Sequence, residues 1–530
     1  MGCYLSINRT CGPVSLAESP LAAVMCLQPR DSRRPTTVPA NIAILCQGSV
    51  GDCQPFIALA LALQKAGTRV RLYAPAEMEA IYAPLFQNTN ADFYPLPHCQ
   101  IQRALDSKAA WQSAMNTGKF THFVKAVEDL EMLDRGIADA NAFLHDLRTA
   151  FPADHIVYNP CVLLYGATAA ELFGVSSTLV SMQMIIAPSA SEPTFLMPPA
   201  TTKRLPGCIN RLIWYCFARL MVNSRTFLYI DKHWRREQLA LRALTIKQKI
   251  AILRGQSHGC SPVVARSPLL SPPPADWSAT DRERVLGALV IDAEDQVKAW
   301  PPSPALCHFL EKQADRPIYI GWGSMTAVSP QHMITLAVRA LVAIGQRAVI
   351  LAGWARLRIE LLEESDAPDA RELLTYAKVN VFILDVHVPH EWLFPRCAAI
   401  VHHGGAGTTA SAVRSSKPSV VTPCFVDQPE LADKVEKLGV GIALGQFASV
   451  TAASLADALR KALFDDALRA RAATIGERLR AEDGAVVVAA DIMSRIQQYA
   501  RQDNSGAGAG APPAAGHPSA SHRVHLIGKA

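Results

Sequence analysis

The stretch of sequence that decides the fold is Ile400-Val-His-His-Gly-Gly-Ala-Gly-Thr-Thr409. A short β-branched run enters it, and a segment of small residues follows its glycines and threonines. This order predicts a buried strand, a glycine turn and a helix, which is the repeating unit of an α/β fold. The first backbone N–H groups of such a helix have no partner within it, and the helix dipole attracts negative charge. We therefore expect a phosphate or pyrophosphate to bind at this turn.

The side chains of this turn also suit an anion. His403 ends the predicted strand and can donate a hydrogen bond to a phosphate, and Thr408 and Thr409 add hydroxyl donors. One of the two adjacent histidines can instead orient the other or pack beneath the loop. The run of glycines favours phosphate binding over simple packing, since it lets the backbone approach a ligand closely.

Strand and turn patterns elsewhere place this stretch in the second of two α/β domains. Strand 41–46, a helix at about 56–66 and strand 68–73 form a first βαβ unit, which implies a parallel sheet. Nine prolines between residues 261 and 317 mark a connection between domains. Further strands are expected at 155–158, 176–181, from 318 onward, 348–351, 379–384, 399–401 and 419–422. The predicted organisation is a flexible leader (1–40), a first domain (41–285), a linker (286–316), a second domain (317–500) and a disordered tail (501–530).

Composition excludes several functional classes. The chain has 530 residues, of which 50% are hydrophobic and 18% charged, as expected for a globular protein with two domains. The formal net charge of +6 is too small for a nucleic-acid binder of this length, although it is compatible with weak attraction to an anionic membrane. The 13 cysteines show no zinc-ligand spacing, so we expect reduced thiols and a cytoplasmic location. No apolar run is long enough to span a bilayer, and residues 1–6 fit a myristoylation pattern that also arises by chance.

A second glycine turn follows the first strand of the first domain. Gly48, Ser49 and Gly51 form a loop on the side of the expected acceptor, and Asp52 comes directly after them. The carboxyl end of a parallel strand is a favoured position for a site. We expect Asp52 to lie in the loop before a helix that starts at Phe56, where a carboxylate facing an acceptor hydroxyl can act as a general base. The alternative is a carboxylate that only caps the helix.

Two further polar turns follow strands of the second domain. The segment 321–326 contains Ser324, whose hydroxyl can bond a phosphate oxygen or cap a helix. Asp427 and Gln428 follow the last predicted strand, and together they can bracket the hydroxyls of a sugar. The alternative for this pair is a loop that caps a helix starting near Pro429.

These turns, in this order and spacing, resemble the motifs of the UDP-glycosyltransferase superfamily. The resemblance points most strongly to sterol 3-β-glucosyltransferases and to the bacterial enzymes that glycosylate antibiotics. It implies the GT-B fold, in which two Rossmann-like, doubly wound domains face each other across a cleft. The matching segments, spread over about residues 41 to 500, are 48–55, 320–325, 388–395, 401–409, 427–429 and 438–441.

The resemblance also implies an activity and roles for individual residues. The expected reaction is an inverting transfer of a hexose, glucose by default, from a UDP-sugar to a hydroxyl of a sterol, lipid or secondary metabolite. It needs no metal or other cofactor. Asp52 would be the base that activates the acceptor, His403 and its turn would hold the pyrophosphate, and Asp427 would contact the sugar. The complete donor-binding set is Ser324, Val388, Trp392, His403, Gly405, Ala406, Gly407, Thr408, Asp427 and Gln428.

Two other functions share parts of this pattern. A nucleotide-sugar epimerase uses the same fold, and a catalytically silent lipid-binding protein could retain it. The sequence also departs from the family at Val50, where a basic residue is frequent, and at Glu430 and Leu431, where aromatic residues are common. These departures leave the identity of the sugar open.

The acceptor side is marked by an apolar segment with spaced arginines. Residues 205–222 contain Arg211 and Arg219 within a run of apolar side chains. This pattern predicts an amphipathic helix that lines a cleft for a lipid acceptor or touches a membrane surface. An ordinary buried helix with basic edges is the alternative. We expect a monomer that binds a UDP-sugar and an apolar acceptor and makes at most peripheral contact with a membrane.

Overall fold

The computed structural model describes residues 40–98, 109–117, 130–184, 187–192, 205–257, 259–312, 315–364, 367–386 and 388–504. The structural statements below concern these residues. The predictions of a flexible leader, of a lipidation pattern at residues 1–6 and of a disordered tail beyond residue 504 lie outside them.

Two six-stranded parallel sheets form the frame of the molecule, so the predicted α/β class is confirmed. The first has the strand order β3-β2-β1-β4-β5-β6 and the second has β12-β11-β10-β7-β8-β9. The strands are β1 (Asn41–Leu45), β2 (Arg69–Pro75), β3 (Ala91–Leu96), β4 (His155–Tyr158), β5 (Ser176–Ser181), β6 (Cys260–Val264), β7 (Ile318–Gly321), β8 (Ala348–Leu351), β9 (Val381–Leu384), β10 (Ile400–His402), β11 (Ser419–Val421) and β12 (Gly441–Ala443). We call the two sheets with their helices the first and the second domain.

The strand order fixes where a ligand can bind. In the first sheet β1 pairs with both β2 and β4, and in the second sheet β10 pairs with both β7 and β11. The order therefore reverses between β1 and β4, and likewise between β7 and β10. Such switch points open a crevice at the carboxyl ends of the strands. The strands at these points are buried on both faces, which is why they read as continuous apolar runs in the sequence.

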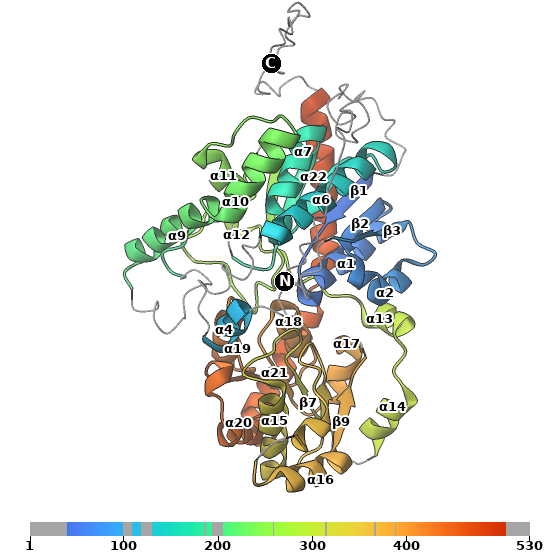
Figure 1. The fold of residues 1–530 in the computed structure, drawn as a ribbon, viewed down its shortest axis with the longest axis vertical. Coiled ribbons are helices and arrows are strands. Elements are labelled where there is room, and N and C mark those ends of the chain that lie inside the picture. The colour runs from blue at the N-terminus through green and yellow to red at the C-terminus, as the bar shows by residue number, and fades with distance from the viewer. Residues whose placement is uncertain are drawn as a thin grey trace, which may run out of the picture.

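Helices cover both sheets, and the two domains lie one above the other in Figure 1. The helices of the first half of the chain are α1 (Val50–Lys65), α2 (Glu79–Tyr82), α4 (Ala109–Thr117), α6 (Leu130–Thr149), α7 (Leu163–Phe173), α9 (Gly207–Val222), α10 (Arg225–Tyr229), α11 (Ile246–Leu253) and α12 (Ala279–Arg282). Those of the second half are α13 (Ala293–Ala299), α14 (Pro304–Glu311), α15 (Pro330–Ile344), α16 (Ala370–Asn380), α17 (His390–Leu393), α18 (Ala406–Arg414), α19 (Gln428–Leu438), α20 (Ala452–Phe464), α21 (Asp466–Arg480) and α22 (Gly484–Asn504). Within the described part of the chain, no helix is long and apolar enough to cross a membrane.

Two segments join the domains, because each of them packs against the other domain and not the one it lies next to in sequence. The last helix, α22, returns to the first domain, where Val488 and Ile492 are buried in one cluster with Ile57 of α1 (Figure 1). In the other direction α4 places Trp111 and Met115 in the buried core of the second domain. The domain boundaries predicted from the sequence do not include either exchange, and they stay a prediction.

The start of α1 corrects one prediction. The helix begins at Val50 rather than at Phe56, so Asp52 lies in its first turn and not in a loop before it. Pro55 lies inside this helix, and proline ordinarily disfavours a helix interior because it has no N–H group. The position near the helix start limits the loss, and the segment stays helical.

Candidate active site

The turn after β10 is built around its two histidines. His402 is buried, and its Nδ1 accepts a hydrogen bond of 3.1 Å from the backbone N–H of Gly404. This histidine packs beneath the loop, which is one of the two roles considered for the pair. His403 is half-buried, and among the described residues its Nδ1 has no hydrogen-bond partner. Burial lowers the pKa of His403 to about 4, so the imidazole is neutral at pH 7.

The helix that follows this turn has an uncapped N-terminus. Gly405 is the N-cap of α18, no side chain accepts from the first turn, and the turn has no acidic residue. The first bond within the helix runs from the Thr409 N–H to the Gly405 carbonyl at 2.8 Å. The backbone N–H groups of Ala406, Gly407 and Thr408 therefore have no partner within the helix. Such a helix end can bind an anion.

The glycines of this turn serve different purposes. A Cβ atom added to Gly405 would lie 2.4 Å from Nε2 of His403, so the protein itself requires glycine there. A Cβ added to Gly407 would meet no atom within 4 Å. Packing within the chain therefore does not explain Gly407. The half-buried Thr408 stands beside it, whereas Thr409, predicted as a second hydroxyl donor, is fully buried.

The turn after β7 lies beside the turn after β10. A Cβ added to Gly323 would meet Cε1 of His403 at 3.3 Å, which places these two residues in contact distance. The Gly323 carbonyl accepts a hydrogen bond of 3.0 Å from the Trp354 N–H, so the turn after β8 fixes the turn after β7. Ser324 follows and is half-buried. Neighbouring strands thus bring the turns that carry Ser324 and His403 to one edge of the second sheet.

Asp427 and Gln428 behave differently from each other. The side-chain carbonyl of Gln428 accepts hydrogen bonds from the backbone N–H groups of Cys424 (2.8 Å) and Phe425 (3.2 Å). Its amide nitrogen lies 3.4 Å from Sδ of Met325. Gln428 therefore holds its own loop together, and its predicted contact with a sugar stays a prediction. Asp427 is also buried, and burial raises the pKa of its carboxyl group.

The segment around Val388 and Trp392, predicted to line the nucleotide base and ribose, packs closely against neighbouring side chains. Val388 is buried in an apolar cluster with Tyr319 and Phe394. Trp392 is half-buried, and the guanidinium carbon of Arg396 lies 4.4 Å from the centre of its ring. Trp392 is thus the more accessible of the two predicted residues, and Val388 packs behind it in the apolar core.

Across the cleft, the turn after β1 centres on Asp52. Its Oδ2 accepts hydrogen bonds from the backbone N–H (2.8 Å) and the hydroxyl (2.9 Å) of Ser49. Burial raises the pKa of this carboxyl group, and the two bonds from Ser49 act in the opposite direction. Gly48 has φ of +128°, and an added Cβ would lie 2.5 Å from the Asp52 side chain. The Asp52 side chain therefore leaves no room for a residue larger than glycine at position 48.

The helices that follow the two turns, α1 and α18, contact each other. Val50 at the start of α1 and Ala406 at the start of α18 both pack against the same apolar cluster of the first domain. The start of α18 therefore packs against the same cluster as the start of α1, the helix that carries Asp52. The apolar Val50, noted above as a departure from the family, is part of this contact.

The structure adds two site residues that the sequence did not predict. Arg266 follows β6, and its guanidinium lies 3.4 Å from Oδ2 of Asp427 and 2.9 Å from Oε1 of Glu430. Gln183 follows β5, and its amide nitrogen lies 3.2 Å from the same Asp427 oxygen. Gln183 could have been found, since it stands just after a correctly predicted strand. Arg266 lies in a stretch that was assigned to the connection between domains.

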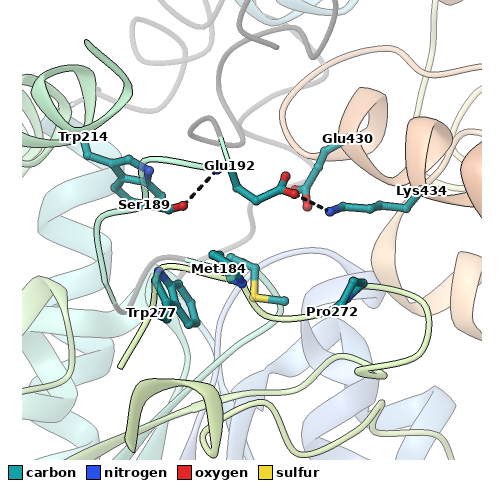
Figure 2. Close-up of a pocket in the computed structure, with 9 residues that line it drawn as sticks. Met184, Ser189, Glu192, Trp214, Pro272, Trp277, Glu430 and Lys434 are labelled. Atoms are coloured by element: carbon teal, nitrogen blue, oxygen red, sulfur yellow. Dashed lines mark hydrogen bonds and ion pairs between the residues drawn. The ribbon is translucent and has the colours of Figure 1, made fainter. Parts of the chain in front are cut away.

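A pocket opens beside these residues, between the first domain and α19 (Figure 2). Its walls on the first domain combine the apolar Met184, Trp214 and Trp277 with the polar Ser189 and Glu192. Glu192 and Lys434 form an ion pair of 3.3 Å across the gap between the domains. In the described part of the chain, the indole N–H groups of both tryptophans are buried without a hydrogen-bond partner. The described residues contain no group of three or more His, Cys, Asp or Glu side chains that could hold a metal ion.

Fold and site together define a GT-B protein with an uncapped helix N-terminus in the second domain and a buried carboxylate at a helix start in the first. Two solved structures support the fold. The calicheamicin glycosyltransferase CalG4 matches with a TM-score of 0.58 and 14% identity, covering 87% of this chain and 99% of that one. The kitacinnamycin glycosyltransferase matches with a TM-score of 0.56 and 19% identity, covering 86% and 99%. The predicted GT-B class is confirmed.

Sequence comparisons identify the relatives more closely. Residues 349–495 match the family of the erythromycin biosynthesis protein CIII-like C-terminal domain. The sterol 3-beta-glucosyltransferase UGT80A2 of Arabidopsis thaliana is 31% identical over 456 residues, which cover 84% of this chain and 64% of that protein. A sterol 3-beta-glucosyltransferase of Cryptococcus neoformans is 27% identical over 488 residues, which cover 87% of this chain and 27% of that protein. The chain thus spans less than two thirds of these relatives, and its predicted resemblance to the UDP-glycosyltransferase superfamily is confirmed.

Proposed function

We propose that this protein is an inverting glycosyltransferase that moves a hexose, glucose by default, from a UDP-sugar to a hydroxyl of a sterol or similar apolar acceptor. The observation that carries the proposal is the uncapped N-terminus of α18, which packs against the same apolar cluster as the start of α1, the helix that carries Asp52. The first suits the diphosphate of a donor, and the second suits the activation of an acceptor. The second domain is then the donor domain and the first is the acceptor domain.

In this mechanism the acceptor hydroxyl attacks the anomeric carbon of the donor sugar. Asp52 takes the hydroxyl proton while the bond between the anomeric carbon and the UDP oxygen breaks. A single displacement inverts the anomeric centre, and the products are the glycoside, UDP and protonated Asp52. His403 is neutral and donates a hydrogen bond, and with the N–H groups of α18 it stabilises the charge that develops on UDP. The reaction so described needs no metal ion.

We propose that the acceptor enters beside α19, where Met184, Trp214 and Trp277 lie around a space of about 20 Å³ (Figure 2). This space holds about one water molecule, so a sterol would need these side chains to move apart. Trp214 and Trp277 are themselves buried, and their indole N–H groups lack a partner among the described residues, so a hydroxylated molecule that entered between them could accept from either. The curated relatives named above act, by their names, on sterols. A sterol is therefore the first acceptor to test, and other apolar alcohols come next.

We further propose that α9 touches an anionic membrane surface. Trp214 on its inner side lines the pocket, whereas Leu212 and Leu220 are 59% and 63% exposed on its outer side. Arg219 and Arg225 stand exposed nearby and suit anionic headgroups. Co-sedimentation with phosphatidylserine vesicles tests this contact. Leu212→Glu should reduce binding severalfold, whereas Phe464→Glu, a matched change at an exposed apolar residue of the donor domain, should not.

The function itself is tested by mass spectrometry of reactions with UDP-glucose and a panel of sterols. We expect a sterol glucoside with the anomeric configuration opposite to that of the donor, formed equally well in the presence of EDTA. A reaction with UDP-glucose alone tests the epimerase alternative, because an epimerase would form a new UDP-sugar without an acceptor. Failure to bind UDP in a thermal-shift assay would instead favour a silent lipid-binding protein.

A further inference from the structure

A buried arginine of the acceptor domain lies against the predicted sugar-binding turn of the donor domain. Arg266 is only 4% exposed, and its guanidinium contacts Asp427 at 3.4 Å and Glu430 at 2.9 Å. Both acids lie at the start of α19, with Asp427 as its N-cap residue and Glu430 in its first turn. One cation therefore binds two carboxylates that belong to the opposite domain.

The backbone around Arg266 is held firmly in the acceptor domain. The Arg266 carbonyl accepts a hydrogen bond of 2.9 Å from Gly287, and the neighbouring Ala265 N–H donates to the Ser181 carbonyl at 2.8 Å. Gln183, from the adjacent strand end, donates to the same Oδ2 of Asp427 at 3.2 Å. Two donors fixed to the first sheet thus converge on one carboxylate oxygen of the second domain.

We propose that Arg266 is a positioning residue for the donor sugar, which orients the Asp427 carboxylate when the two domains close. This inference rests on the proposed function. It also accounts for the departure from the family at residue 430, because Glu430 is the second carboxylate that Arg266 binds. Oδ2 of Asp427 is held by Arg266 and Gln183, and the same carboxylate keeps Oδ1 to accept a bond from a sugar hydroxyl.

The charge of Arg266 has a second effect on Asp427. Burial raises the pKa of the Asp427 carboxyl group, the Arg266 charge lowers it, and the Glu430 charge raises it. Without the guanidinium, burial and Glu430 act together and favour the protonated acid. A protonated carboxyl group is a poorer acceptor for sugar hydroxyls, so the affinity for the donor sugar becomes dependent on pH.

Calorimetry with UDP and UDP-glucose tests the inference, because UDP lacks the sugar. In Arg266→Gln we expect unchanged affinity for UDP and about tenfold weaker binding of UDP-glucose, with part of the loss recovered as pH rises from 5.5 to 8. Arg266→Lys should fall between the variant and the wild type, because it restores the charge without the two-pronged geometry. The Michaelis constant for UDP-glucose should rise in parallel with the dissociation constant.

The matched control is Arg347→Gln. Arg347 is as buried, at 5% exposed, but its guanidinium bonds the carbonyls of Phe309 and Asp315, which do not belong to α19. It should lose stability without changing the ratio of the UDP and UDP-glucose affinities. If Arg266→Gln keeps the wild-type ratio at every pH, the inference is overturned while the proposed function stands. If the wild type binds neither ligand, both proposals fail.

Discussion

The N-termini of α1 and α18 are built from the same plan and differ in one respect. Each helix follows a central parallel strand and a glycine turn, and the two helices contact each other where the domains meet. The first turn of α1 contains Asp52, whose carboxylate accepts two bonds from Ser49. The first turn of α18 has neither an acidic residue nor a side-chain cap.

This difference assigns the two sides of the cleft. At α1 the protein supplies its own negative charge, which satisfies the helix dipole and disfavours a further anion there. At α18 the dipole and the backbone N–H groups are free to bind an anion from outside. We therefore propose that the donor diphosphate binds at α18 and that the carboxylate on α1 takes a proton from the acceptor.

The largest effect is expected from removing the charge at α1. Asp52→Asn keeps the size of the side chain and an oxygen for Ser49, but it removes the base. We expect turnover to fall by about 10²- to 10⁴-fold with unchanged affinity for UDP-glucose, measured by initial rates and calorimetry. Because burial raises the pKa of Asp52, the wild-type rate should be lost as pH falls through a value above that of an ordinary aspartate. Retained turnover in the variant would remove Asp52 as the base.

The next effect is expected at the α18 side. His403→Ala should weaken UDP-glucose binding by about 10- to 100-fold, since a hydrogen bond to a charged group contributes about 1.5–3 kcal/mol. His403 has a pKa of about 4, so it stays neutral and the wild-type affinity should be constant between pH 5.5 and 8. A step in affinity near pH 6.5 would show that His403 binds the donor as a cation.

A smaller effect separates the two glycines of the same turn. Gly407→Ala should leave thermal stability unchanged or slightly higher, because alanine favours a helix and no atom lies within 4 Å of its Cβ position. Its UDP-glucose affinity should nevertheless fall severalfold, since the methyl group enters the space of the anion. Gly405→Ala should lower both properties, because it displaces His403. Equal effects of the two substitutions would contradict the placement of the anion.

The smallest effect is expected from Ser49→Ala. Loss of the hydroxyl should cost about 1 kcal/mol of unfolding free energy, as for other helix caps. Because the Ser49 bonds lower the pKa of Asp52, the acidic limb of the pH–rate profile should move to higher pH. Chemical denaturation and the pH profile measure the two effects. An unchanged profile would mean that protonation of Asp52 does not control the reaction rate.

Much of the frame was predictable because central parallel strands are buried on both faces. The bounds of β4, β5 and β8 agree with the prediction residue for residue. The strand β6 was missed because Pro262 lies within it and further prolines follow. Local patterns could not reveal the contact of Arg266 with Asp427, since 161 residues separate the two and only the packing of the domains joins them.

Hydrogen–deuterium exchange with and without UDP tests the central comparison most directly. The account predicts that UDP slows exchange of the amides of Ala406, Gly407 and Thr408 at the start of α18. The amides of residues 50–53 at the start of α1 should be protected much less. Protection centred on α1, or none at α18 when UDP is saturating, would contradict the assignment of the donor to the uncapped helix.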